Sequence, residues 1–190
     1  MSAPATPPRD PEDLGHAQPT PDAATVVLIR RDGPAPRVLM GQPGAGAAFM
    51  PNKFVFPGGA IDRGDAAVPL AAPLREADRV RLTALPVTPT PPPPEAMIAA
   101  AVRELWEEAG LMLAASGNWP AMPDPDWQPF AAAGLAPDPA ALRFIFRAVT
   151  PPGRTRRFDA PFFLAGAEAL VGDPDDFSAA ADELAHLLWI

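Results

Sequence analysis

One short segment carries three glutamates and an arginine at spacings that would bring their side chains together on a helix. It reads RELWEEAGL over residues 103–111, and its carboxylates belong to Glu104, Glu107 and Glu108. Residues 95–109 predict a helix, because apolar residues recur there at i, i+3 and i+4. On a helix the three carboxylates fall on one arc, since Cβ atoms three or four positions apart lie roughly 5–6 Å from one another.

This arrangement is costly for a helix with a purely structural role. Like charges at these spacings destabilise a helix by roughly 0.2–0.5 kcal/mol per pair. The glutamates also stand near the C-terminal end, where the helix dipole disfavours anions. Arg103 relieves part of the repulsion, because it precedes Glu107 by four residues and can bridge to it. The remaining repulsion indicates that a cation binds here; a solvated, charged helix face is the alternative.

The composition limits the class of protein. The chain has 190 residues, 48% of them hydrophobic, so one domain with one core is expected. Its formal net charge of −8 argues against nucleic acid or an anionic membrane surface as the main partner. The absence of cysteine excludes disulfides and thiolate chemistry. Neither an apolar run of about 18 residues nor a signal-type segment occurs, so a cytoplasmic location is expected.

Proline-rich segments divide the chain. Residues 1–22 have the composition of a disordered tail, 88–94 (TPTPPPP) predicts a stiff connector, and 116–140 has the composition of a loop. Strands are expected at 25–30, 37–42, 54–56, 142–150, 160–166 and 183–190. Several strands with one strong helix favour the α/β class, with a mixed sheet under helical cover.

The glutamate-rich segment resembles the second half of the Nudix box, G-x5-E-x7-R-E-U-x-E-E-x-G-U, in which U is a bulky apolar residue. Every fixed position of that half is matched, by Arg103, Glu104, Leu105, Glu107, Glu108, Gly110 and Leu111. A chance match in a chain of this length has a probability on the order of 1 in 10⁴–10⁵. The resemblance implies a Nudix hydrolase domain over residues 23–190, with the α/β/α sandwich of that family.

The first half of the box departs from the family pattern. The sequence FVFPGGA resembles the family's lead into the box and retains Gly58 and Gly59, but an Ala- and Pro-rich stretch at 61–94 follows. Glu95 keeps the seven-residue spacing to Arg103. We interpret the box as split by an insertion. Glu95 is then either the first box glutamate or an acidic residue favoured in a first helical turn.

Residues 49–62 and 150–165 resemble the branch of the family related to peroxisomal coenzyme A diphosphatases. Within the second segment, Ala160 and Pro161 replace a threonine and an arginine that are usual in that branch. Nudix domains normally follow the final strand with a second long helix, whereas this chain stops at Ile190. We therefore expect that helix to be missing, the chain being a fragment or a reduced variant.

The resemblance implies Mg²⁺ or Mn²⁺ as the cofactor, and carboxylate oxygens are the donors that these cations prefer. It implies that Glu107 and Glu108 ligate the metal, with Glu104 as a ligand or a base. The backbone carbonyl of Gly58 would supply a further oxygen. Arg103, which would hold Glu107 in place, completes the expected catalytic set.

Other candidates lie outside the helix. Glu183, six residues before Trp189, fits the position of a further acidic residue in several members, as ligand or base; a strand-edge charge is the alternative. Arg154 and Arg157 could bind substrate phosphates, or they belong to an exposed basic turn. Gly59 is expected beside the substrate.

The implied reaction is hydrolysis of a diphosphate bond in a nucleoside diphosphate linked to another moiety. Coenzyme A or acyl-coenzyme A is the first substrate expected, with dinucleotides and ADP-ribose left open. A catalytically inactive Nudix-fold sensor is the alternative, and a proline-rich scaffold is a third reading. A homodimer is one possible oligomeric state, since many members of the family pair as dimers. Trp119, Trp127 and Phe130 either form a lid that stacks on a base or, more commonly, anchor a loop to the core.

Overall fold

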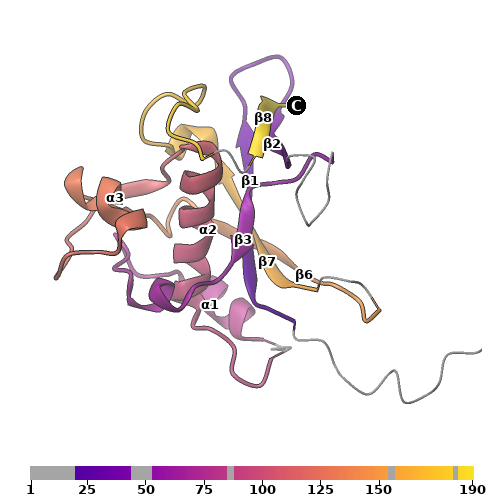
Figure 1. Cartoon of the computed structure of the whole chain (residues 1–190), viewed down its shortest axis with the longest axis vertical. Helices are drawn as coiled ribbons and strands as arrows, with labels where there is room; N and C mark the ends of the chain where they lie inside the picture. The colour runs from indigo at the N-terminus through magenta and orange to yellow at the C-terminus, as the bar shows by residue number, and fades with distance from the viewer. Residues whose placement is uncertain (1–19, 44–52, 85–87, 154–156, 182–183) are drawn as a thin grey trace, which may run out of the picture.

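The helices pack against one side of a mixed sheet (Figure 1). A computed structural model of the chain describes residues 20–43, 53–84, 88–153, 157–181 and 184–190. The elements are β1 (Ala23–Arg30), β2 (Arg37–Pro43), β3 (Gly58–Ala60), η2 (Arg63–Ala67), α1 (Glu76–Thr83), α2 (Pro94–Ala109), β4 (Ala114–Ser116), η3 (Pro125–Trp127), α3 (Gln128–Ala132), β5 (Leu135–Pro137), β6 (Arg143–Val149), β7 (Asp159–Gly166), η4 (Ala167–Ala169) and β8 (Leu184–Trp189).

The main sheet has six strands. Five follow the order β6-β7-β1-β2-β8, and β3 pairs with the first residues of β1. The pairing of β1 with β7 is parallel, and the other pairings are antiparallel. A separate hairpin joins β4 and β5. The predicted α/β class with a mixed sheet is confirmed.

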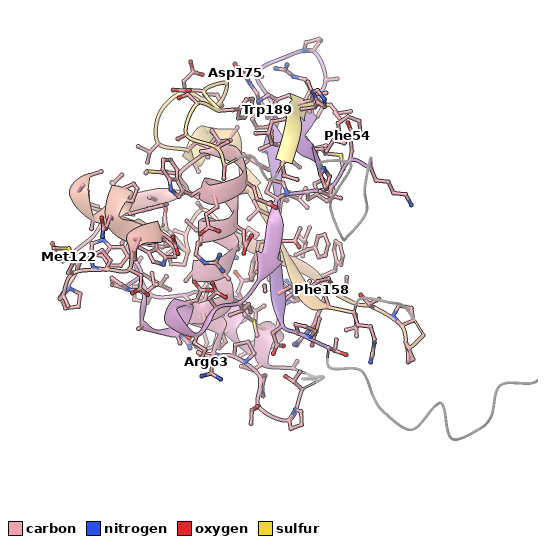
Figure 2. All side chains as sticks on the ribbon, viewed as in Figure 1. Phe54, Arg63, Met122, Phe158, Asp175 and Trp189 are labelled. Carbon is pink, nitrogen blue, oxygen red and sulfur yellow. The ribbon has the colours of Figure 1, made fainter. Side chains whose placement is uncertain are left out.

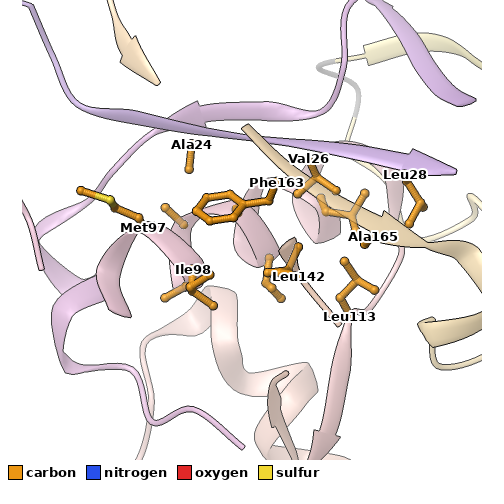
Figure 3. Close-up of a cluster of buried hydrophobic side chains, with 14 of the residues drawn as sticks. Ala24, Val26, Leu28, Met97, Ile98, Leu113, Leu142, Phe163 and Ala165 are labelled. Atoms are coloured by element: carbon orange, nitrogen blue, oxygen red, sulfur yellow. The ribbon is translucent and has the colours of Figure 1, made fainter. Parts of the chain in front are cut away.

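Buried and partly exposed residues alternate along β1 and β7, which distinguishes the two faces of this sheet. Val26 lies opposite Phe163 in the register, and both side chains are fully buried beneath α2 (Figure 3). The intervening positions, Thr25 and Phe162, belong to the other face and stay partly exposed. Because neighbouring side chains of a strand point to opposite faces, one face forms the core, and no helix of the described residues covers the other.

Helix α2 is fixed at both ends by backbone chemistry. It begins at Pro94, which suits the first turn because a proline lacks the N–H that would have no helical partner there. It ends at Gly110, whose φ of 69° is left-handed. A Cβ on Gly110 would come within 2.9 Å of the nitrogen of Ala180, so a larger residue would disrupt this end.

The predicted apolar stripe of α2 is buried, and it consists of Ile98, Ala101, Val102, Leu105 and Ala109. Burial of a leucine or isoleucine side chain stabilises the fold by about 1.5–3 kcal/mol. This stripe therefore fixes the rotation of the helix, and with it the direction in which the glutamates point.

All helices of the described residues lie on one side of the sheet (Figure 1). The third layer of the α/β/α sandwich that the family resemblance implies is not found among these residues. Within the same described ranges, no helix has the length and apolar character needed to cross a bilayer.

Two predictions about local structure were wrong. Residues 54–56 are not a strand; Val55 makes one isolated bridge to Gly41, and the strand lies at Gly58–Ala60 instead. Glycines let this segment approach β1 closely, since a Cβ on Gly58 would stand 2.4 Å from the carbonyl oxygen of Ala24. Residues 116–140 also form more than a loop, because they contain η3, α3 and β5.

The expected insertion carries ordered structure, with η2 and α1 inside residues 61–94. Helix α1 lies beside the edge strand β6, where Arg81 donates from Nη1 to the carbonyl oxygen of Phe144 at 2.7 Å. The Arg81 guanidinium also stands over the Phe144 ring, 4.7 Å from its centroid. The insertion thereby covers part of an edge that would otherwise be free to pair with another strand.

Candidate active site

The C-terminal half of α2 presents the three glutamates predicted from the sequence. Glu104 and Glu108 are buried, with 8% and 7% exposure. The Glu107 side chain is 29% exposed. The three side chains follow the buried stripe around the helix, so they lie at the edge of the core facing β3 and η2.

Arg103 links these carboxylates. Its Nη1 donates to Glu104 Oε1 at 2.9 Å and to Glu107 Oε2 at 3.0 Å, and the second contact is the bridge predicted from the four-residue spacing. Its Nη2 donates to the carbonyl oxygen of Ala60 at 2.8 Å. Burial opposes the charge on Arg103, but the hydrogen bonds to Asp65 and the nearby Glu104 hold its pKa above the ordinary arginine value.

Asp65 is the principal partner of Arg103, and sequence reasoning missed it. Both of its oxygens accept from the guanidinium, each at 3.1 Å, and the residue is 1% exposed. It also accepts the N–H of Asp62 at 2.8 Å, which fixes it within η2. A signal was available, because Asp65 stands six positions after Gly59, the spacing that the box requires of its first glutamate.

Glu95 does not meet Arg103. It lies in the first turn of α2 and forms an ion pair with Arg79 of α1. Burial would raise the pKa of Glu95, but the hydrogen bond and charge of Arg79, together with a backbone hydrogen bond, hold the pKa below the usual glutamate range. Asp65, and not Glu95, thus contacts Arg103. The first box position of Glu95 stays a prediction.

The glycine pair of β3 lies directly against the glutamates. The N–H of Gly58 donates to Glu108 Oε2 at 2.8 Å. A Cβ on Gly59 would stand 2.4 Å from Glu104 Oε2, so that carboxylate packs onto bare backbone. Any side chain at Gly59 would displace Glu104. The predicted use of the Gly58 carbonyl as a ligand is a separate question, and it stays a prediction.

Burial is the main cause that disfavours the charged form of Glu107. Burial raises the pKa of Glu107, and nearby Asp126 and Asp62 raise it further against the opposing effect of Arg103. A carboxylate whose charged form is disfavoured in this way gains most from a bound cation. The charged form of Glu107 is thus disfavoured mainly by burial, and the contacts with Arg103 oppose this effect.

The donor set suits a hard divalent cation, because it consists of carboxylate and backbone oxygens without sulfur or imidazole. In the part of the chain that the structure describes, no three acidic or histidine side chains converge on a common point. Glu104 instead turns to Arg103, and Glu108 turns to Gly58. The residues fit a metal by the chemistry of their donor atoms.

Three further residues were predicted from the sequence, namely Arg157, Arg154 and Glu183. Arg157 lies at the turn between β6 and β7, where its Nε donates to the carbonyl oxygen of Thr150 at 3.2 Å. Arg154 and Glu183 lie outside the described residues. The N–H of Ala181, two positions before Glu183, donates to the carbonyl oxygen of Glu107 at 2.7 Å. The substrate and metal roles of these residues stay predictions.

The aromatic residues of the 116–140 segment anchor it to the core. Trp127 and Phe130 are 3% and 0% exposed, and their ring centroids lie 5.1 Å apart. Trp119 packs against Trp127 and donates from Nε1 to the carbonyl oxygen of Leu135 at 2.7 Å. Buried rings of this kind do not form a lid, so the commoner of the two readings is correct.

Comparisons with known proteins agree with this site. No family model matches the chain. A Caenorhabditis elegans protein that carries the name nudix hydrolase 7 is 28% identical over 180 residues, which cover 88% of this chain and 50% of that protein. The crystal structure of a NUDIX hydrolase from Alicyclobacillus acidocaldarius is 30% identical, with a TM-score of 0.62, over 92% of this chain and 80% of that one.

A third similarity is weaker. The NUDIX domain of Shewanella oneidensis NrtR, solved with ADP ribose, matches 95% of this chain and 77% of its own, at 11% identity and a TM-score of 0.46. A similarity at that level carries no argument about this chain.

The chain belongs to the Nudix hydrolase family. The similarity to the Alicyclobacillus structure extends over most of both chains, and the second half of the box assembles around Arg103. The chain spans about half the length of the curated relative that it matches.

Proposed function

We propose that the protein hydrolyses a diphosphate bond in a nucleoside diphosphate linked to another moiety, with the help of a divalent cation. The observation that carries this proposal is the contact of a three-glutamate helix face with a glycine pair. Glu104 packs on Gly59, and Glu108 accepts from the N–H of Gly58. The two glycines let the carboxylates lie against the backbone of β3, where carboxylate and backbone oxygens could hold one cation together.

In this proposal Glu104, Glu107 and Glu108 hold Mg²⁺ or Mn²⁺, with the Gly58 carbonyl and Glu183 as further ligands. When bound, the cation neutralises charge on the phosphates and lowers the pKa of a water molecule. Glu104 also stands as the candidate base, as the resemblance to the Nudix box implies. Arg103 positions Glu104 and Glu107 through its two Nη1 contacts.

Coenzyme A or an acyl-coenzyme A is the first substrate to test, because two segments of the chain resemble the branch related to coenzyme A diphosphatases. Ala160 and Pro161 depart from that branch, so ADP-ribose, NADH and diadenosine polyphosphates complete the panel. The box residues concern the diphosphate and not the groups attached to it. Arg154 and Arg157 are proposed as contacts to the substrate phosphates.

The test is hydrolysis of this panel by the purified chain with Mg²⁺, with Mn²⁺ and with EDTA. We expect release of a nucleoside monophosphate or its equivalent that depends on the metal and stops with EDTA. Binding of a panel member in calorimetry without turnover would instead favour the nucleotide sensor. Turnover that persists in EDTA would contradict the role given to the glutamates.

A further inference from the structure

The face of the sheet opposite α2 carries a row of residues that starts at the candidate site. Gly58 pairs with Thr25, Thr25 pairs with Phe162, and Phe162 pairs with Phe146, so the row crosses β3, β1, β7 and β6. Neighbouring strands lie about 4.8 Å apart, which puts Phe162 roughly 10 Å from Gly58. The row thus leads from the carboxylate that contacts Gly58 to a phenylalanine pair.

These side chains share the face opposite α2. Phe163 and Val26, the neighbours of Phe162 and Thr25, are fully buried beneath α2. Because successive side chains of a strand point to opposite faces, Phe162 and Thr25 point away from α2. A Cβ on Gly58 would stand 2.4 Å from the Ala24 carbonyl oxygen and 2.7 Å from Thr25 Cα, so the backbone of Gly58 lies directly against Thr25. Figure 2 shows Phe54 and Phe158 on the same side of the sheet, away from α2 and α3.

Three phenylalanines form a platform here. The rings of Phe146 and Phe162 are stacked, with centroids 4.4 Å apart and planes inclined by 17°. Phe56 meets Phe162 edge to face, with centroids 6.5 Å apart. Phe146 is 49% exposed. An exposed ring in a stack offers its free face to another flat ring, and aromatic side chains bind nucleobases in this way.

We propose that Phe146, Phe162 and Phe56 are the subsite that binds the base of the nucleoside diphosphate substrate. The base stacks on the phenylalanine pair, the ribose lies over Thr25, and the diphosphate reaches Gly58 and Glu108. This inference rests on the proposed function, because it assigns the base end of the same substrate. A nucleotide fits this surface because the strand register connects the platform through Gly58 to Glu108, one of the carboxylates proposed to hold the cation.

The test compares Phe146→Leu and Phe146→Tyr with the unchanged protein. Leucine keeps an apolar side chain and removes the flat ring, whereas tyrosine keeps the ring. For the panel substrate that is cleaved, we expect Phe146→Leu to raise KM roughly tenfold with little change in kcat, and Phe146→Tyr to stay within about twofold. A diphosphate ester without a base should show no such increase in KM.

Val149→Ala is the matched control, because Val149 is a 39% exposed residue of the same strand that pairs with Asp159, away from the platform. Thermal unfolding of each variant checks the fold. Equal losses for substrates with and without a base would overturn the inference, as would an unchanged KM in Phe146→Leu.

A binding measurement separates this inference from the proposed function. Calorimetry with ADP, GDP and UDP needs no turnover, so it tests the platform even if no substrate is cleaved. Binding that weakens about tenfold in Phe146→Leu and persists in Phe146→Tyr would support the platform while the hydrolase proposal fails. Absence of binding of all three nucleotides to the unchanged protein, or equal binding by all variants, would overturn it.

Discussion

Among single residues, the buried pair of Asp65 and Arg103 decides where the carboxylates of the site point. Arg103 contacts Glu104 and Glu107, and Asp65 holds the guanidinium through two hydrogen bonds. A buried ion whose partner is removed costs far more than an exposed one, since water cannot replace the lost contact.

We therefore expect Asp65→Asn to lower the free energy of unfolding by roughly 3 kcal/mol or more, measured by urea denaturation. Asp62→Asn is the control. Its side chain is 69% exposed and stands 3.7 Å from Arg103 Nη2, and surface pairs of this kind contribute about 0–1 kcal/mol. Equal effects of the two substitutions would contradict the role assigned to Asp65.

The same residue shows how far sequence reasoning could reach. The bridge between Arg103 and Glu107 followed from helical spacing alone, and the structure contains it. Asp65 also has the box spacing from Gly59, but it is an aspartate, and the long insertion separates it from Arg103. Glu95 has the box spacing to Arg103, but its ion-pair partner is Arg79, which comes from within the insertion.

Among the elements, β3 and α2 form the site together. Helix α2 was predictable because its apolar period and its closing glycine are strong local signals. Strand β3 was not, because Gly58 and Gly59 have low strand propensity and pair only through their fit against β1. Helix α1 was missed for a related reason, since its mainly polar surface gives little apolar periodicity.

The contact between these elements gives a prediction for Gly59→Ala. The new Cβ would stand 2.4 Å from Glu104 Oε2, so the glutamate must move from its place. A misplacement of about 1 Å at a reacting group can lower the rate roughly 100-fold, and we expect a loss of kcat of that order. Gly33→Ala, whose Cβ would meet no atom closer than 3.8 Å, should leave kcat unchanged. Normal kcat in Gly59→Ala would mean that Glu104 is not a reacting group.

For the whole molecule, charge is the dominant feature of the site. The chain has a formal net charge of −8, and acidic groups crowd the end of α2, where burial raises the pKa of Glu107. A raised pKa of an acid means that the folded state binds the proton more tightly than the unfolded state. Without a cation, stability from this group is present at low pH and is lost as pH rises above the ordinary glutamate value of about 4.3.

Bound Mg²⁺ or Mn²⁺ should reverse this loss, because the metal binds the ionised carboxylate. At a metal concentration about 100 times Kd, the stabilisation is about 2.7 kcal/mol, which raises Tm by roughly 5–10 °C for a domain of this size. We expect the increase to be large near pH 7 and small near pH 4.5 in thermal unfolding. An increase that is equal at both pH values, or unchanged in Glu107→Gln, would contradict cation binding at this face.

The most direct measurement is the metal-dependent kcat of Glu108→Gln beside Glu76→Gln, on whichever panel substrate the protein cleaves. The first substitution removes one charge from the cluster while keeping the shape of the side chain. The second does the same at an α1 side chain that is 79% exposed. The account predicts a roughly 100- to 1,000-fold lower kcat for Glu108→Gln and an unchanged kcat for Glu76→Gln. Full activity of Glu108→Gln would contradict the central claim that the glutamate face of α2 carries the reaction.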